Sequence, residues 1–324
     1  MSFIAPARLP RRAVHGVLLL DKPVGLSSNA ALQRARRLLR AEKAGHTGTL
    51  DPLASGLLPL CFGAATKFAQ VSLDADKAYR ATLRLGITTT TGDAEGEVLE
   101  RRPVAVSAEA LRAACVASVG PTVQRPPMHS ALKHQGRPLY AYARAGIEVE
   151  RAGREVVLHA IELVEGADDT WTLDVRCSKG TYVRTLAEAI GEQLGCGAHL
   201  AALRRTASGP LRLEDAHTLE AIEDLDEPSR DALLLPPDAL LADWTPVRLD
   251  AEGAARFLSG VRRRVTLDDL PRVRVYGPEP AAFLGGGHVR GGELISTRLL
   301  SPIEAGDLLG VPRRPGPDTQ RTAP

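Results

Sequence analysis

Residues 45–56 read Gly45-His46-Thr47-Gly48-Thr49-Leu50-Asp51-Pro52-Leu53-Ala54-Ser55-Gly56 and are the most informative stretch of the chain. Glycine and threonine precede the carboxylate, and Pro52 restricts Asp51 to extended backbone conformations. The stretch therefore predicts a tightly turned loop that can hold Asp51 at the floor of a cleft. The alternative is that Asp51 caps the following turn. The phosphate-binding pattern GxxxxGK[ST] is absent, which excludes a P-loop here.

The segments on both sides of this loop predict a mixed α/β fold. Residues 17–20 form a short apolar run typical of a buried strand, and Ser27 or Ser28 offers an N-cap for a helix over 28–42. Alternating polar and apolar residues in 79–85 indicate a half-exposed strand. Further strands are expected at 57–62, 78–86, 155–164 and 171–177, helices at 107–119, 138–146 and 181–194, a polar loop at 88–97, and a short amphipathic element at 200–205.

Length and composition indicate a globular protein of two domains, or of one large domain with an attachment. The chain has 324 residues, of which 44% are hydrophobic and 25% charged, as in a protein with a sizeable core. Short strands with glycine turns from 244 to about 309 predict a small β domain. We therefore expect a flexible basic arm (1–12), a main domain (13–243) that ends in an acidic boundary stretch, the small β domain (244–310), and a disordered tail (311–324).

The composition also narrows the class of protein. No apolar run approaches the roughly 18 residues that span a bilayer, and residues 17–20 are too short for a signal-peptide core. The four cysteines, at 61, 115, 177 and 196, show neither a CxxC pair nor zinc-ligand spacing. We expect reduced, buried thiols in a cytoplasmic protein.

The net charge of +2 conceals a strong segregation along the chain. Residues 1–50 carry nine Lys/Arg against two acidic residues, whereas residues 214–243 carry ten acidic residues against one arginine. A basic block of this kind points to nucleic acid. The basic arm, the 28–42 helix and Arg204 with Arg205 are the candidate contacts to the nucleic-acid backbone, and a solvated helix face is the alternative for the helix.

Several motifs, in order along the chain, resemble those of one family. They are Leu20-Asp21-Lys22-Pro23-x-Gly25-x-Ser27-Ser28, the 45–52 loop, Tyr79-Arg80, Gly86-Ile87-Thr88-x-Thr90-x-x-Asp93-x-x-Gly96-x-Val98, Pro126-Pro127-x-x-Ser130-Ala131-Leu132-Lys133-x-x-Gly136, Cys177-Ser178-Lys179-Gly180-Thr181-Tyr182-Val183-Arg184 and Gly197-Ala198-His199-Leu200-x-x-Leu203-Arg204-Arg205. Together they closely resemble the TruB family of tRNA pseudouridine synthases of the bacterial type over about residues 16–215. The C-terminal segment is similar to the PUA-like domain of bacterial members.

The resemblance implies a fold and a set of site residues. The fold is α/β (α+β): a mixed, largely antiparallel sheet with flanking helices and a central cleft, plus a small C-terminal β-barrel-like PUA domain. Asp51 matches the nucleophile, Arg184 the arginine that pairs with it, and Tyr79 the tyrosine that stacks on the flipped base and assists proton transfer. A guanidinium beside Asp51 would keep that carboxylate ionised against desolvation. The substrate-binding positions that the motifs imply are His46, Tyr182, Leu203 and Lys22, of which Lys22 also supports the cleft.

The implied activity is the isomerisation of uridine 55 in the T-loop of tRNA to pseudouridine. The N1–C1′ bond breaks and a C5–C1′ bond forms, so the resemblance implies no cofactor and no metal. The expected partner is the T-arm of tRNA, without a membrane or an obligate protein partner. Addition of Asp51 at uracil C6, attack at C1′ and a glycal route all remain open. Chemistry on a base requires that the base leave the stack.

Two other functions compete with this one. The first is a tRNA-folding chaperone that uses the same surface, and the family resemblance suggests that both activities coexist. The second is a glycoside-cleaving enzyme, which needs a second carboxylate; Asp93 and Glu95 are the candidates, although a flexible polar loop explains them better. His129 departs from the family, whose members commonly carry tyrosine there, so a role given to that tyrosine does not transfer.

Overall fold

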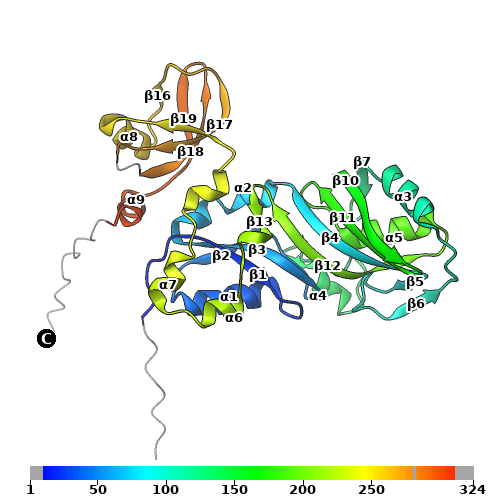
Figure 1. The fold of residues 1–324 in the computed structure, drawn as a ribbon. Helices are drawn as coiled ribbons and strands as arrows, with labels where there is room; N and C mark the ends of the chain where they lie inside the picture. The colour runs from blue at the N-terminus through cyan, green and yellow to red at the C-terminus, as the bar shows by residue number, and fades with distance from the viewer. Residues whose placement is uncertain (1–9, 280–281, 311–324) are drawn as a thin grey trace, which may run out of the picture.

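The computed structural model describes residues 10–279 and 282–310. The predicted disordered tail at 311–324 and most of the predicted basic arm therefore lie outside the described residues. The predicted fold class is confirmed: a large mixed sheet with flanking helices is joined to a smaller curled sheet (Figure 1). The large sheet has the strand order β14-β1-β3-β12-β4-β11-β10-β7, to which β13 and β2 add at the side.

The elements of the large sheet follow the sequence patterns closely. Its strands are β1 (Gly16–Lys22), β2 (Ala44–His46), β3 (Ala54–Phe62), β4 (Lys77–Leu85), β7 (Gly120–Gln124), β10 (Arg154–Ala167), β11 (Thr170–Cys177), β12 (Ala198–Ser208), β13 (Leu211–Arg212) and β14 (His217–Thr218). The short strands β5 (Ile87–Thr89) and β6 (Val98–Arg101) pair with each other, as do β8 (Lys133–His134) and β9 (Arg137–Pro138). The pairs β1–β14 and β3–β12 are parallel, and the other pairs are antiparallel.

Helices and short 3-10 turns cover the large sheet. They are α1 (Ser28–Leu38), η1 (Gly63–Lys67), α2 (Ala69–Asp74), α3 (Ala108–Ala117), α4 (Leu139–Ala143), α5 (Val183–Gln193), η2 (Leu213–Asp215), α6 (Leu219–Glu223), α7 (Glu227–Ala232) and η3 (Pro237–Leu241). α3 and α5 pack on β10 and β12 in one apolar core, and α1 and α6 pack beside β1 and β3 in a second. The central strands β3, β12 and β4 therefore run between two cores, and this is where the site lies.

One boundary differs from the sequence-based expectation, and two other segments gain a defined place. The 28–42 helix ends at Leu38 because Arg40 adopts a positive φ of 50°, which a helix cannot contain. The amphipathic element at 200–205 is a stretch of the strand β12. The acidic 214–243 stretch is part of the main body: β14 pairs with β1, and α6 packs on α1.

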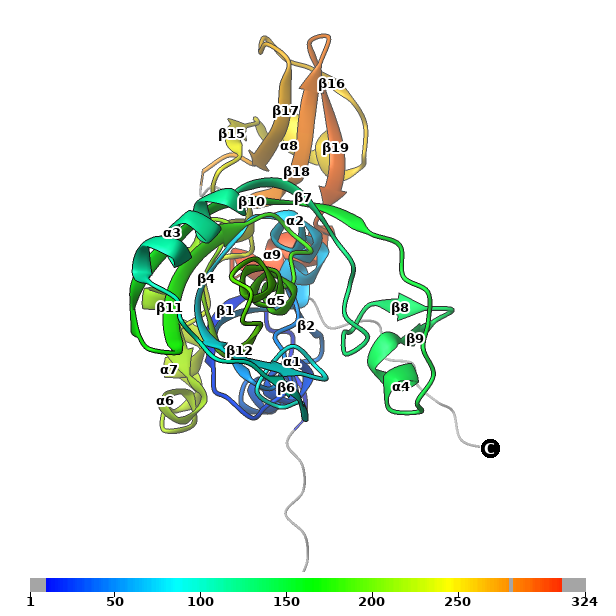
Figure 2. The same ribbon diagram turned by 90° about the vertical axis from the view of Figure 1, so that its right-hand side faces the viewer.

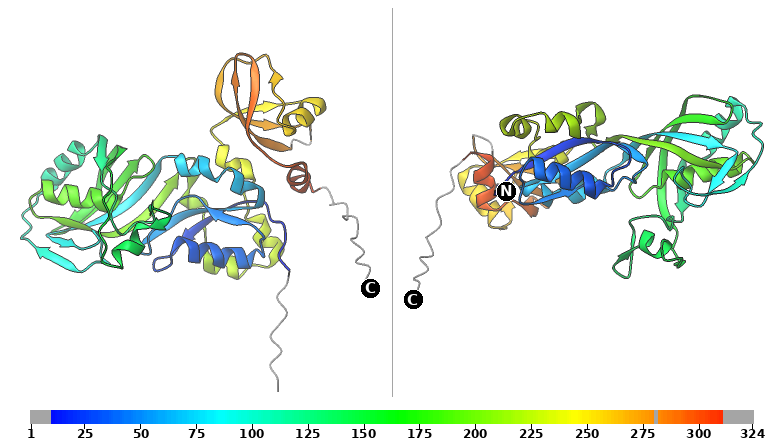
Figure 3. Two further views of the ribbon diagram at one scale, coloured as in Figure 1. Left: turned by 180° about the vertical axis from the view of Figure 1, so that it is seen from behind. Right: turned by 90° about the horizontal axis from the view of Figure 1, so that it is seen from below.

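The C-terminal part is a five-stranded sheet of order β15-β17-β18-β19-β16. Its elements are β15 (Thr245–Arg248), α8 (Ala251–Leu258), β16 (Arg263–Arg264), β17 (Leu270–Tyr276), β18 (Phe283–Arg290), β19 (Glu293–Leu299) and α9 (Pro302–Leu308). It stands at one end of the large sheet (Figure 3). The Phe68 and Phe283 rings lie 5.2 Å apart across the junction, where Lys67 also pairs with Glu304.

A second projection carries β8, β9 and α4. It extends from the sheet on a long connection between β7 and β10 (Figure 2). The helix α4 is shorter than the expected 138–146 helix, and it begins after Pro138, as the fixed φ of proline favours. Residues 129–130, at the base of this projection, line a cavity together with the predicted nucleophile Asp51.

Candidate active site

The loop before β3 is fixed by buried hydrogen bonds. The Ser28 hydroxyl, at the start of α1, accepts from the backbone N–H of Leu50 at 2.7 Å and donates to the Leu50 carbonyl at 3.0 Å. Gly48 has φ +111°, a region that favours glycine. At Gly56, with φ +97°, a Cβ would lie 2.3 Å from the carbonyl oxygen of Arg205 on the neighbouring strand. The sequence pattern of this loop therefore fixes where Asp51 sits.

Asp51 and Arg184 form an ion pair, with 2.9 Å between Asp51 Oδ2 and Arg184 Nη2. Arg184 lies in the first turn of α5 and is only 5% exposed. Burial raises the pKa of Asp51, whereas the positive charges of Arg184 and Lys22 oppose that rise. The geometry thus has the ion pair that the motifs implied.

Arg184 contacts more than Asp51. Its guanidinium donates to the His129 carbonyl at 2.7 Å and to the Thr91 carbonyl at 3.2 Å, and Nη1 lies 3.3 Å from Asp93 Oδ2. Two carboxylates and two carbonyls therefore surround one buried cation. The base of the β8–β9–α4 projection is attached to Asp51 through this side chain.

The structure contradicts the expectation that Asp93 lies in a flexible polar loop. Asp93 is 3% exposed and not part of a flexible loop, because its Oδ1 accepts from the Thr91 hydroxyl at 2.5 Å and from the Glu95 backbone N–H at 3.1 Å. Its backbone also bridges to Leu200 of β12. Asp93 belongs to a motif quoted for the family resemblance, and that motif was the signal that could have placed it in the site.

Tyr79, Leu203 and Tyr182 line the same cavity as Asp51 and Arg184; its volume is about 280 Å³. Strand pairing brings the first two together, because Leu203 of β12 lies opposite Ala54 of β3 and Ala81 of β4, two positions beyond Tyr79. Tyr182 is the N-cap residue of α5, and its backbone N–H donates to the Gln124 side chain at 2.8 Å. Burial raises the pKa of Tyr79.

His46 and Lys22 lie around this centre in different ways. His46 lines a second cavity of about 500 Å³ that also reaches Asp51, and burial lowers its pKa. Within the described part of the chain, the His46 Nδ1 has no hydrogen-bond partner. Lys22 is completely buried, and its ammonium donates to the carbonyls of Pro23 and Leu26. Burial lowers the pKa of Lys22 to about 8. Its placement fits support of the 23–26 turn better than direct contact with a substrate.

The predicted backbone contacts to nucleic acid are largely occupied within the chain. Arg204 pairs with Asp21 at 2.6 Å, and Arg34 of α1 pairs with Glu223 of α6 at 2.6 Å. Arg205 is 1% exposed and cannot reach a bound phosphate, so that expectation is wrong.

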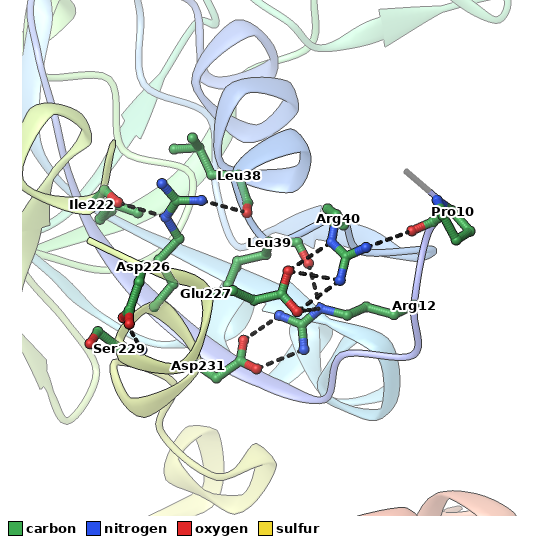
Figure 4. Close-up of polar contacts among 11 residues, drawn as sticks. Pro10, Arg12, Leu38, Leu39, Arg40, Ile222, Asp226, Glu227, Ser229 and Asp231 are labelled. Carbon is green, nitrogen blue, oxygen red and sulfur yellow. Dashed lines mark hydrogen bonds and ion pairs between the residues drawn. The ribbon is translucent and has the colours of Figure 1, made fainter. Parts of the chain in front are cut away.

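The end of the predicted basic arm is held in the same way. Arg12 pairs with Asp231, and Arg40 pairs with Glu227 of α7 at 2.7 Å (Figure 4). Arg12 also forms a β-bridge to Ala41. The acidic 214–243 stretch thus neutralises part of the basic block.

Three further predictions from composition concern the whole chain. All four cysteines are buried and unpaired, as expected. No three His, Cys, Asp or Glu side chains in residues 10–279 and 282–310 converge as metal ligands would. None of the described helices is both long enough and apolar enough to cross a bilayer.

Comparison with known proteins agrees with the motifs. The N-terminal domain model of TruB family pseudouridylate synthases matches residues 36–183, and the tRNA pseudouridylate synthase B C-terminal domain matches residues 184–242. The chain is 57% identical over 309 residues to tRNA pseudouridine synthase B of Verminephrobacter eiseniae, covering 93% of each chain. It is 59% identical over 303 residues to the protein of that description from Ralstonia nicotianae, covering 91% of this chain and 96% of the relative.

Solved structures show the same fold at lower identity. A chain in the crystal structure of the archaeal box H/ACA sRNP Nop10-Cbf5 complex superposes with a TM-score of 0.68 at 23% identity, covering 90% of this chain and 88% of that one. A chain of a Cbf5-Nop10-Gar1 complex gives a TM-score of 0.69 at 24% identity, with 93% and 92% covered. With its motifs, its fold and its full-length relatives in agreement, the chain belongs to the TruB family of pseudouridylate synthases.

Proposed function

We propose that this protein converts uridine 55 in the T-loop of tRNA to pseudouridine. The observation that carries the proposal is the convergence of Asp51, Arg184 and Tyr79, from three separate elements, on one cavity. The relatives described as tRNA pseudouridine synthase B support tRNA as the substrate. A tRNA substrate also places the reaction in the cytoplasm.

The chemistry is an isomerisation without net gain or loss of atoms. The N1–C1′ bond breaks, the uracil turns, the C5–C1′ bond forms, and the proton on C5 is replaced by one on N1. Asp51 is the nucleophile and must be ionised, which Arg184 favours against burial. Tyr79 stacks on the extruded base and assists the proton transfer, and Leu203 packs against the base.

The remaining residues hold the RNA and the site. His46, beside the second cavity, contacts the rearranged loop of the RNA, and Tyr182 closes the first cavity at the start of α5. Lys22 acts on the site through the 23–26 turn and through its charge on Asp51. Residues 13–243 form the catalytic domain, and the curled sheet from 244 to 310 is a PUA-like RNA-binding domain.

The experiment is a conversion assay on an unmodified tRNA transcript in buffer with EDTA. Pseudouridine is mapped by carbodiimide treatment and primer extension. We expect a new stop at the T-loop uridine with the wild-type chain and none with Asp51→Asn, which should still bind tRNA. Bound but unmodified tRNA with the wild-type chain would favour a folding chaperone, and release of free uracil would favour glycoside cleavage.

A further inference from the structure

Arg205 is the largest of the completely buried side chains, and the mechanism above does not use it. It lies in β12 directly opposite Tyr79 of β4 in the antiparallel register. It also lines the cavity that contains Asp51 and Tyr79. A permanent positive charge is therefore placed under the site, beside the side chain that is proposed to move protons.

The guanidinium is held rigidly by backbone carbonyls. Its Nε donates to the Leu57 carbonyl at 2.6 Å, and Nη2 donates to the Gly48 carbonyl at 3.2 Å. Gly48 packs closely beside the guanidinium, since a Cβ there would be in van der Waals contact with Arg205 Nη1 at 3.4 Å. These contacts come from the loop and the strand that carry Asp51, so Arg205 keeps one orientation.

Arg205 differs from the other buried arginine of the site in its partners. Arg184 faces two carboxylates, whereas Arg205 makes no ion pair with any carboxylate in the described ranges of the chain. A buried charge without a counter-ion is costly. Such a charge is useful where a negative charge develops during a reaction and has to be stabilised.

The group that Arg205 faces is the Tyr79 hydroxyl. Burial raises the pKa of Tyr79, and the charge and donated hydrogen bond of Arg205 oppose that rise. A guanidinium can only donate, so it occupies a lone pair of the phenol oxygen. The O–H of Tyr79 is then left for a group in the cavity, which Tyr79 lines together with Asp51.

We propose that Arg205 is a positioning residue that orients the Tyr79 hydroxyl and stabilises its phenolate. The inference rests on the proposed function. During the isomerisation, Tyr79 gives its O–H proton to N1 of the uracil and becomes a phenolate. The phenolate then takes the proton from C5 as the C5–H electron pair returns to the ring, which restores the phenol. Between the two transfers the negative charge on the tyrosine oxygen lies against Arg205.

Other charged or titratable groups around Tyr79 do not replace Arg205. Asp51 and Cys177 of the neighbouring β11 both raise the pKa of Tyr79. Lys77 of β4 lies on the same face of the strand, but its three donors are used by the carbonyls of Ser72, Leu73 and Ala75. Arg205 is therefore the group placed to stabilise the phenolate.

The test compares Arg205→Gln and Arg205→Lys with the control Arg84→Gln. Arg84 lies on β4, the strand of Tyr79, but its side chain is 42% exposed and pairs with Asp169. Each protein is made with fluorinated tyrosine, whose lower phenol pKa brings the titration into the range of the folded protein. The ¹⁹F signal of Tyr79 is assigned by its loss in Tyr79→Phe. Single-turnover conversion of tRNA is measured on unlabelled samples of the same variants.

We expect Arg205→Gln to raise the Tyr79 titration midpoint by on the order of one pH unit, because an adjacent opposite charge is lost. Its single-turnover rate should fall about 10²-fold, as when one preorganised donor is removed. tRNA binding should stay unchanged. Arg205→Lys keeps the charge and should recover most of both effects, and Arg84→Gln should show neither.

An unchanged Tyr79 midpoint in a folded Arg205→Gln chain would overturn the inference, whatever its rate. If Arg205→Gln does not fold, a folded Arg205→Lys chain as slow as Tyr79→Phe would overturn it instead, because the charge is present there. Failure of both variants to fold would assign Arg205 a purely structural role and also overturn the inference. A wild-type chain that makes no pseudouridine would refute the proposed function separately, since the titration needs no turnover.

Discussion

Replacement of Asp93 by asparagine tests how the site keeps Arg184 in place. Asp93 and Arg184 have side-chain exposures of 4% and 6%, and their closest charged atoms are 3.3 Å apart. Asparagine keeps the Oδ1 acceptor for the Thr91 hydroxyl and the Glu95 N–H, but it removes the negative charge. It also turns an amide donor towards a guanidinium that can only donate.

The size of the expected loss of stability in Asp93→Asn depends on the partners that Arg184 keeps. Removal of one partner of a buried ion pair costs about 3–5 kcal/mol when the other charge is left alone. Arg184 keeps Asp51 and two carbonyls, so we expect the free energy of unfolding to fall by about 2–3 kcal/mol, the value of a hydrogen bond to a charged group. Asp51→Asn is the matched control. Asp51 is 39% exposed, so its loss should change the free energy of unfolding by less than about 1 kcal/mol.

The raised pKa of Asp51 determines how its charge affects the free energy of unfolding. Burial raises the pKa of Asp51 above its unfolded value, so its ionisation disfavours the folded state at neutral pH. The neutral asparagine removes that disadvantage and offsets the lost ion pair. Asp51→Asn should therefore be inactive but nearly as stable as the wild type, whereas Asp93→Asn should be clearly less stable.

Urea unfolding followed by circular dichroism at pH 7 gives the stabilities, and release of tritium from C5-labelled uridine in tRNA gives the rates. Because the negative charge of Asp93 raises the pKa of Asp51, its removal should move the acidic limb of the rate profile to lower pH. The reasoning is refuted if Asp93→Asn is no less stable than Asp51→Asn, or if the acidic limb moves to higher pH.

Three further predictions concern the loop, the basic helix and the buried lysine. Gly56→Ala should lower the free energy of unfolding by about 3 kcal/mol or more, since its Cβ would lie 2.3 Å from a carbonyl oxygen of β12. The control is Gly25→Ala, which is also at positive φ but has nothing within 4 Å of the added Cβ. It should lose only about 1 kcal/mol in the same urea assay. Arg37→Gln at the exposed face of α1 should reduce the salt slope of tRNA binding by roughly one, whereas Arg34→Gln, already paired with α6, should leave it unchanged in filter binding. The pKa of Lys22 is about 8 in the folded chain and 10.5 in the unfolded chain. The free energy of unfolding of the wild type, relative to Lys22→Met, should therefore fall as the pH falls from 10.5 to 8. A difference between the two proteins that does not change with pH would contradict the burial argument.

Local sequence patterns correctly predicted the helices and strands that depend mainly on their own residues. The strand at 171–177 and the helix at 181–194 agree with the structure within two residues, because apolar periodicity is a local property of the sequence. The ending of α1 was missed because it depends on the positive φ of Arg40, an arginine at a position that usually favours glycine or asparagine. The type of the 200–205 element stayed open in the sequence, because six residues cannot distinguish a strand from a helix turn, and the structure shows a strand.

The site was predicted through its motifs and not through its geometry. The motifs named Asp51, Tyr79 and Arg184, but the register that sets Arg205 opposite Tyr79 is a property of the β4–β12 pairing. Burial of Asp93 likewise depends on a bridge to β12 that no local pattern contains. Long-range pairing therefore decided which polar residues of the motifs face the cavity.

Long-range contacts also explain why the basic and acidic blocks are separated in sequence. They change which residues are free to attract RNA. The basic block at 1–50 and the acidic stretch at 214–243 lie far apart in sequence, but Arg12, Arg34 and Arg40 pair with carboxylates of α6 and α7. Opposite charges that meet within the fold attract a polyanion much less than the count of arginines implies. All residues outside these two blocks together carry a net charge of only +4. Attraction for tRNA should therefore be weaker than the basic block alone implies, and the exposed Arg37 of α1 remains a candidate contact.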